Sequence, residues 1–147
     1  MLSPTRSLNS SNLSLKAPAC NLLIFSDSRE RLEKLSSALG SQKVRIIRVS
    51  SLEELRAACR TKQDMAIFDA GPETIEEALH AIRDSKANSR TQLLVVADRI
   101  ASEPGLAGVL PVWRAMPCSR EQMAQLVRQR SVSASEAIET GFRRKIL

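Results

Sequence analysis

Two aspartates of this 147-residue chain stand at the ends of short apolar runs. Asp69 directly follows the run 65–68 and precedes a Gly-Pro pair, and Asp27 follows the run 22–25 with one serine between. A carboxylate held at the end of a buried strand can bind a ligand or a cation, whereas one that only closes the strand caps the next turn or helix. Both interpretations are open for Asp69 and for Asp27 on these residues alone.

The apolar patterns on either side predict the elements that would position these carboxylates. Short apolar or alternating runs predict strands at 22–25, 44–49, 65–68, 93–97 and 109–110. Apolar residues at helical spacing predict helices within 26–40, 50–60, 72–87 and 119–130, with a weak one at 101–106. Five strands alternating with five helices indicate an α/β domain whose mostly parallel sheet is covered on both faces.

In open parallel sheets ligands sit at the carboxyl ends of the strands, so the residues after each strand matter most. The expected strand-end residues are Ser26 to Ser28, Asp69, Ala97 with Asp98, and the segment 113–117.

Length and composition predict one globular domain with unstructured ends, because 43% hydrophobic content in 147 residues suffices for a single core. We expect a disordered leader at 1–20, an ordered domain at 21–130 and a tail or linker helix at 131–147. The leader is rich in serine and lacks acids, which is also typical of an organellar transit peptide. The formal net charge of +6 permits contact with nucleic acid, but only 3% of residues are aromatic.

The cysteines and the single histidine do not form a recognisable site. Cys20, Cys59 and Cys118 are widely spaced, so a structural zinc or a disulfide framework is not expected, and Cys59 should pack as a small apolar residue. His80 lies within an expected helix without a partner at ligand spacing and should be an ordinary surface residue. With no catalytic motif, signal peptide or apolar membrane span, we expect a cytoplasmic protein that is not an enzyme.

At the strand ends the chain resembles the receiver domain of bacterial two-component response regulators, over roughly 21–130. "LLIFSDSRERLEKL" is similar to the family's first strand with its acidic pair, "DMAIFDAGP" to the strand that carries the phosphoacceptor, and "MPCSREQMAQLV" to its Lys-Pro turn and last helix. The resemblance implies a flavodoxin-like, doubly wound sheet of order 2-1-3-4-5. It also implies that Asp69 is the phosphoacceptor and that Asp27 with Asp69 could bind Mg²⁺.

Three positions depart from the family's pattern. Ser26 stands at the other acidic position, Ala97 at the Ser/Thr position, and Met116 at the lysine. Arg114 is the nearby cation, although its planar guanidinium does not reproduce the geometry of an ammonium, and Trp113 lies close to the switch aromatic. The resemblance therefore implies a degenerate phosphorylation pocket, with no cofactor required and Mg²⁺ binding at most weak.

These features predict a pseudo-receiver that acts in signalling through contacts with a protein partner or a second copy of itself, without a membrane role. The resemblance places its partner surface near the last helix, with Trp113, Arg120 and Arg128. In the tail, Phe142 lies at helical spacing with Ile138 and Ile146, which predicts a short amphipathic helix that could dock on a partner. Arg114, Met116 and Gln122 belong to the same surface. Two alternatives stay open: a DNA-binding transcriptional regulator or its N-terminal part, and a response regulator that is phosphorylated on Asp69.

Overall fold

The computed structural model describes residues 20–40, 43–102 and 105–130 of the chain. The expectations for a leader before residue 20 and a tail after residue 130 lie outside these described residues. Its strands are β1 (Cys20–Ser26), β2 (Val44–Val49), β3 (Met65–Asp69), β4 (Gln92–Val96) and β5 (Ala115–Cys118). They form one parallel sheet in the order β2-β1-β3-β4-β5, which confirms the predicted fold class.

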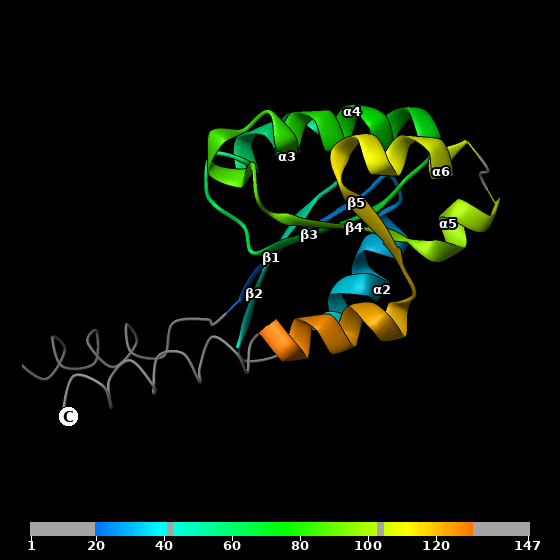
Figure 1. Ribbon diagram of the computed structural model, residues 1–147. Helices are drawn as coiled ribbons and strands as arrows, with labels where there is room; N and C mark the ends of the chain where they lie inside the picture. Colours follow the sequence, from blue (N-terminus) through cyan, green and yellow to red (C-terminus); the bar gives the residue numbers. More distant parts are fainter. Residues whose placement is uncertain (1–19, 41–42, 103–104, 131–147) are drawn as a thin grey trace, which may run out of the picture.

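The helices cover both faces of this sheet, as Figure 1 shows. They are α2 (Arg29–Leu39), α3 (Leu52–Ala58), α4 (Pro72–Arg83), η1 (Lys86–Asn88), α5 (Ala97–Ser102), α6 (Leu106–Val109), η2 (Leu110–Trp113) and a last described helix at 120–130. α3, α4 and α6 lie on one face, and α2 with helix 120–130 lies on the other. Two buried apolar clusters fill the two interfaces, with Leu23, Phe25 and Phe68 in one and Leu22, Ile24 and Ile67 in the other.

Local sequence signals set where the helices begin. The Ser28 hydroxyl accepts from the backbone N–H of Arg31 at the start of α2, and Ser51 accepts from that of Glu54 at the start of α3. Glu54 completes a reciprocal capping arrangement by accepting from Ser50, and these hydrogen bonds lower the pKa of its carboxyl. Pro72 occupies the first turn of α4, where its missing N–H costs nothing.

The last strand is not where the sequence predicted it. Val109 and Leu110, expected as a strand, belong to α6 and η2, and Leu110 is buried in the core. β5 instead holds the less strand-like sequence Ala-Met-Pro-Cys, and it can do so because an edge strand tolerates Pro117 on its unpaired side.

Two other boundaries differ by a residue. β4 ends at Val96, so Ala97 opens α5 rather than closing the strand. Cys20, which the sequence placed in the leader, is buried in β1, and its N–H donates to the Lys43 carbonyl. The small apolar side chain of Cys20 suits that buried position.

At the amino-terminal ends of the strands, Arg83 ties the loops together. Its guanidinium, at the end of α4, donates to the carbonyls of Asn88, Ser89, Thr91, Trp113 and Arg114. One side chain therefore joins the loop entering β4 to the segment entering β5.

Candidate functional site

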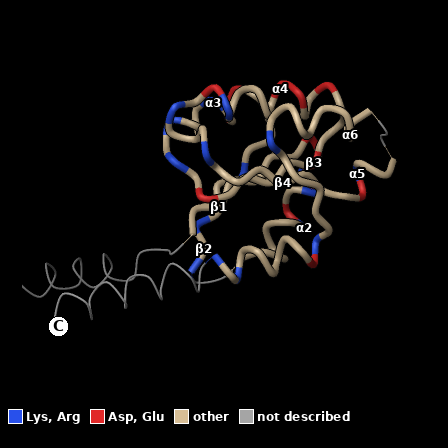
Figure 2. Tube along the Cα trace, viewed as in Figure 1, with Lys and Arg blue, Asp and Glu red and all other residues tan. Residues whose placement is uncertain are grey.

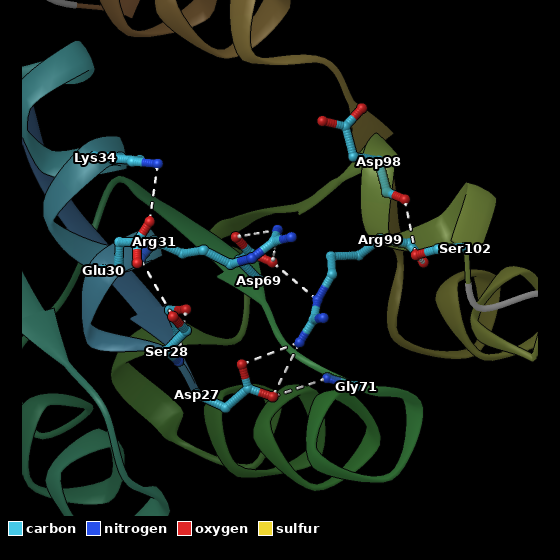
Figure 3. Close-up of polar contacts among 11 residues, drawn as sticks. Asp27, Ser28, Glu30, Arg31, Lys34, Asp69, Gly71, Asp98, Arg99 and Ser102 are labelled. Carbon is cyan, nitrogen blue, oxygen red and sulfur yellow. Dashed lines mark hydrogen bonds and ion pairs between the residues drawn. The ribbon is translucent and has the colours of Figure 1, made fainter.

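Asp69 and Asp27 meet at the carboxyl ends of β3 and β1. Ser26 is the register partner of Asp69, and the Asp27 N–H donates to the Asp69 carbonyl over 3.4 Å. The Asp69 side chain is fully buried, whereas Asp27 is 39% exposed. The carboxyl ends of parallel strands share one edge, which is why the two predicted residues lie side by side (Figure 3).

Arg31 covers one side of the Asp69 carboxylate. It lies in the first turn of α2, whose start at the Ser28 cap places it beside the sheet edge. Its Nη1 donates to both Asp69 carboxylate oxygens at 3.3 Å. No sequence motif indicated Arg31, because its role depends on where α2 begins.

Arg99 covers the other side and bridges both aspartates. Because α5 begins directly after β4, Arg99 follows the sheet edge by three residues and turns back over it. Its Nε lies 3.0 Å from Asp69 Oδ1, and its Nη2 donates to both Asp27 oxygens at 3.0 Å. The side chain is only 19% exposed. No sequence motif indicated Arg99, because its role depends on where β4 ends.

The backbone completes the partners of Asp27. The Gly71 N–H, just before α4, donates to Asp27 Oδ2 over 3.2 Å. Ser26, buried beside it, accepts from the Ser28 N–H through its hydroxyl. Asp27 therefore does not cap α2, a role taken by Ser28, and instead joins β1 to the loop before α4.

Two guanidinium groups thus balance the two carboxylates. We name Asp27, Asp69, Arg31 and Arg99 the ion cluster. Mg²⁺ prefers an octahedron of oxygen ligands with several waters, yet the acidic oxygens here face arginines, and Ser26 lacks a carboxylate. No group of three or more His, Cys, Asp or Glu side chains suitable for a metal occurs in the described part of the chain. The residues of the ion cluster in this arrangement do not fit a magnesium site.

Two other positions that the sequence placed in the pocket are Ala97 and Met116. Ala97 lies at the carboxyl end of the sheet, whereas Met116 lies within β5. Ala97, half-buried, is the first residue of α5 and supplies no hydroxyl. Met116 pairs with Leu94, which pairs with Ile67, so it lies two residues before the level of Asp69. Its side chain is 47% exposed, and Met116 is therefore a surface residue rather than a pocket residue.

Trp113 and Arg114 lie at the opposite end of the sheet from Asp69. They precede β5 instead of following the last strand, so they join the loops at the amino-terminal ends. The Trp113 ring is half-buried against exposed His80, with ring centroids 5.1 Å apart, and Arg114 Nη2 donates to the Ser89 carbonyl. Neither residue belongs to the ion cluster, and the misplaced last strand explains why the sequence put them there.

The residues predicted to bind a partner do not lie on one surface. Arg120 and Arg128 are exposed on helix 120–130, whereas Trp113 lies under α4 on the other face of the sheet. Phe142 lies outside the described residues.

The cysteines take no part in the site. Cys20, Cys59 and Cys118 are free and buried, and burial raises the pKa of each thiol. For Cys20, burial and the nearby Asp64 carboxylate raise the pKa to about 11. Within the described ranges, no helix has the length and apolar character needed to span a membrane.

Comparison with solved structures identifies the fold. The chemotaxis response regulator CheY4 of Vibrio cholerae superimposes with a TM-score of 0.60 at 16% identity, over 76% of this chain and 98% of that one. A signal receiver domain of a two-component signal transduction histidine kinase from Clostridium thermocellum gives a TM-score of 0.56 at 13% identity, over 76% and 96%. No family model and no curated protein sequence matches the chain. The chain thus has the fold of receiver domains.

Proposed function

We propose that this chain is a receiver-like signalling protein that works through protein contacts without phosphorylation. In this proposal it is a cytoplasmic pseudo-receiver, not an enzyme, and it requires no cofactor. The ion cluster carries the proposal, because the buried Asp69 carboxylate already has both oxygens paired with arginines.

Phosphoryl transfer to Asp69 would require a different arrangement. An aspartate that accepts a phosphoryl group needs an open approach and a cation that offsets the charge of the incoming phosphate. Here the carboxylate is fully buried, and Arg99 would have to leave both aspartates before a phosphoryl donor could approach. Ala97 also offers no hydroxyl to follow a phosphate. The ion cluster therefore favours one fixed state over a phosphate-driven switch.

An apolar patch beside β5 supports contact with another protein. Val112 is 69% exposed and Met116 is 47% exposed, and these are the large exposed hydrophobic side chains among the described residues. Pro111 and Pro117, next to them in the chain, are exposed as well. Exposed apolar side chains grouped at a sheet edge are typical of a protein interface, either with a second copy or with another protein.

Affinity capture from source cells with three variants tests the proposal. We expect Val112→Asp with Met116→Asp to lose captured protein at least tenfold, because a buried charge opposes an apolar contact. Asp69→Asn should capture the same proteins as the unmodified chain. Magnesium with beryllofluoride, a phosphoryl mimic, should change neither the capture nor the melting temperature.

Ser37→Asp with Gln125→Asp adds the same two charges at exposed positions outside the apolar patch and serves as the control for non-specific loss. If capture or the melting temperature of the unmodified chain changes with beryllofluoride, and Asp69→Asn abolishes this response while thermal melts show that it is folded, the chain is a phosphorylatable regulator and the proposal fails. Capture that is unchanged in the Val112 and Met116 variant would instead reject the apolar patch.

A further inference from the structure

The parallel topology gathers a second group of charged residues at the end of the sheet opposite the ion cluster. Every loop that enters a strand lies at this edge, and three neighbouring loops carry exposed cations. The loop into β3 holds Arg60 and Lys62, the loop into β4 holds Lys86 and Arg90, and Arg114 precedes β5. Figure 2 shows basic residues at the left of the view, where the chain enters β3 and β4.

Helix 120–130 adds one more cation. Arg130 Nη2 donates to the Asp64 carbonyl, just before β3, which fixes it at the same edge. We name the group the basic edge, and its members are Arg60, Lys62, Lys86, Arg90, Arg114 and Arg130.

Few acids offset these charges. Asp64 and Asp84 lie at this edge, and Asp64 Oδ2 is occupied by the Asn21 N–H at 2.7 Å. The ion pairs among described side chains involve Arg31, Lys34 and Arg99, and none uses a member of the basic edge. Burial and the neighbouring Arg114 guanidinium lower the pKa of Arg83, which agrees with a positive potential at this end.

The residues between the cations indicate the kind of partner. Thr61, Ala87 and Ser89 are exposed in the loops into β3 and β4, and none is a large apolar side chain that could anchor a protein interface. Val112, an exposed apolar side chain close to Arg114 in the chain, belongs to the apolar patch beside β5. The aromatic ring nearest this edge, Trp113, is half-buried against His80, so no stacking platform for single-stranded bases is present on the described loops. Long cationic side chains among small polar residues suit contacts to a phosphate backbone.

From this arrangement we propose that the basic edge binds the phosphate backbone of double-stranded nucleic acid, without reading sequence. The loops into β3, β4 and β5 stand two strand spacings apart, about 10 Å, and the side chains extend the reach further. That span faces several consecutive phosphates of a duplex, which carries one charge for about every 1.7 Å of its axis. The site is separate from the ion cluster, which carries the proposed signalling function. The four cations that are replaced in the test below lie in the loops into β3 and β4, and not in the segment that holds Val112 and Met116.

Fluorescence anisotropy with a labelled 20-base-pair DNA duplex of arbitrary sequence tests the inference in the full chain. We expect a Kd of about 1–100 μM at physiological salt, tighter binding at low salt, and affinity that falls steeply as salt rises. Replacing Arg60, Lys62, Lys86 and Arg90 by Gln should weaken binding at least tenfold and reduce the salt slope by about 0.9 for each lost contact. Arg83 and Arg114 are left intact because they hold backbone carbonyls.

A matched control removes the same charge elsewhere. Replacing Arg29, Lys34, Arg48 and Arg120, all exposed and away from this edge, by Gln removes four positive charges as well, so the two variants have the same net charge. This control should bind DNA within about threefold of the unmodified chain, because only its net charge is altered.

Three results would overturn the inference. Equal losses in the two variants would mean that net charge, not the basic edge, causes binding. Loss of binding only on replacing Arg143, Arg144 and Lys145 by Gln would assign it to the tail. Equal competition by a single strand or by polyglutamate, at matched charge, would show that the edge does not favour a duplex. Thermal melts confirm that each variant folds.

Discussion

Among individual residues, Arg99 connects more of the site than any other member of the ion cluster. It contacts a buried carboxylate through Nε and a second carboxylate through Nη2, and thereby joins α5 to the ends of β1 and β3. A buried carboxylate that loses a cationic partner retains its desolvation cost, so the removal of Arg99 should cost more than the loss of a surface ion pair.

We predict that Arg99→Gln lowers the free energy of unfolding by about 2 kcal/mol, because Asp69 keeps only Arg31. Arg99→Lys should cause an intermediate loss, since an ammonium cannot bridge both carboxylates as the planar guanidinium does. Urea unfolding measures both. Arg29→Gln, at an exposed position in α2, is the control, and an equal effect of the two glutamine substitutions would contradict the bridging role.

The two carboxylates of this cluster can be predicted from the sequence, but its two arginines cannot. Asp27 and Asp69 are recognisable because they follow apolar strands and because parallel strands end together. The arginines lie on helices, and their direction depends on the Ser28 cap and on the exact end of β4. The predicted strand ended at Ala97 instead of Val96, and with that end Arg99 could not be assigned to the first turn of a helix beside the aspartates.

Among the secondary-structure elements, β5 depends most on its surroundings. Strands β1 to β4 are rich in apolar side chains and were predicted from that pattern, with boundary shifts of about a residue. β5 has Pro117 and two exposed side chains in four residues, so nothing local distinguishes it from a loop. Its position is fixed from outside by pairing with β4 and by the bonds from Arg83 to Trp113 and Arg114.

Because of these bonds we predict that Arg83→Lys lowers the free energy of unfolding by about 3 kcal/mol. A lysine cannot reach carbonyls on both sides of the guanidinium, and those left without a donor lose their hydrogen bonds. Trp113 fluorescence should change as well, because its carbonyl accepts from Arg83 Nε at 2.8 Å. Chemical unfolding followed at the tryptophan measures both effects.

Arg90→Lys serves as the comparison, since Arg90 is exposed in the neighbouring loop and retains its charge. If Arg83→Lys and Arg90→Lys unfold alike, Arg83 contributes charge rather than the connection between the loops.

For the whole molecule, the sheet separates two electrostatic environments. The carboxyl ends hold a compensated cluster of two carboxylates and two guanidiniums, whereas the amino ends hold the basic edge. The sequence reported the net charge of +6 but not this separation, because the cations of the basic edge are scattered from Arg60 to Arg130. Only the common direction of the strands brings them together.

This separation should make stability increase with salt. Two unit charges about 10 Å apart in water repel by about 0.4 kcal/mol, and the Debye length shrinks from above 10 Å to below 8 Å as NaCl rises from about 20 to 300 mM. Screening of several such pairs should raise the free energy of unfolding of the unmodified chain by about 0.5–1 kcal/mol.

The variant lacking Arg60, Lys62, Lys86 and Arg90 should gain less or lose stability, since salt then acts mainly on the remaining ion pairs. The control lacking Arg29, Lys34, Arg48 and Arg120 should keep the full gain. Equal salt responses of the two variants in urea unfolding would place the repulsion in the overall charge, not at the basic edge.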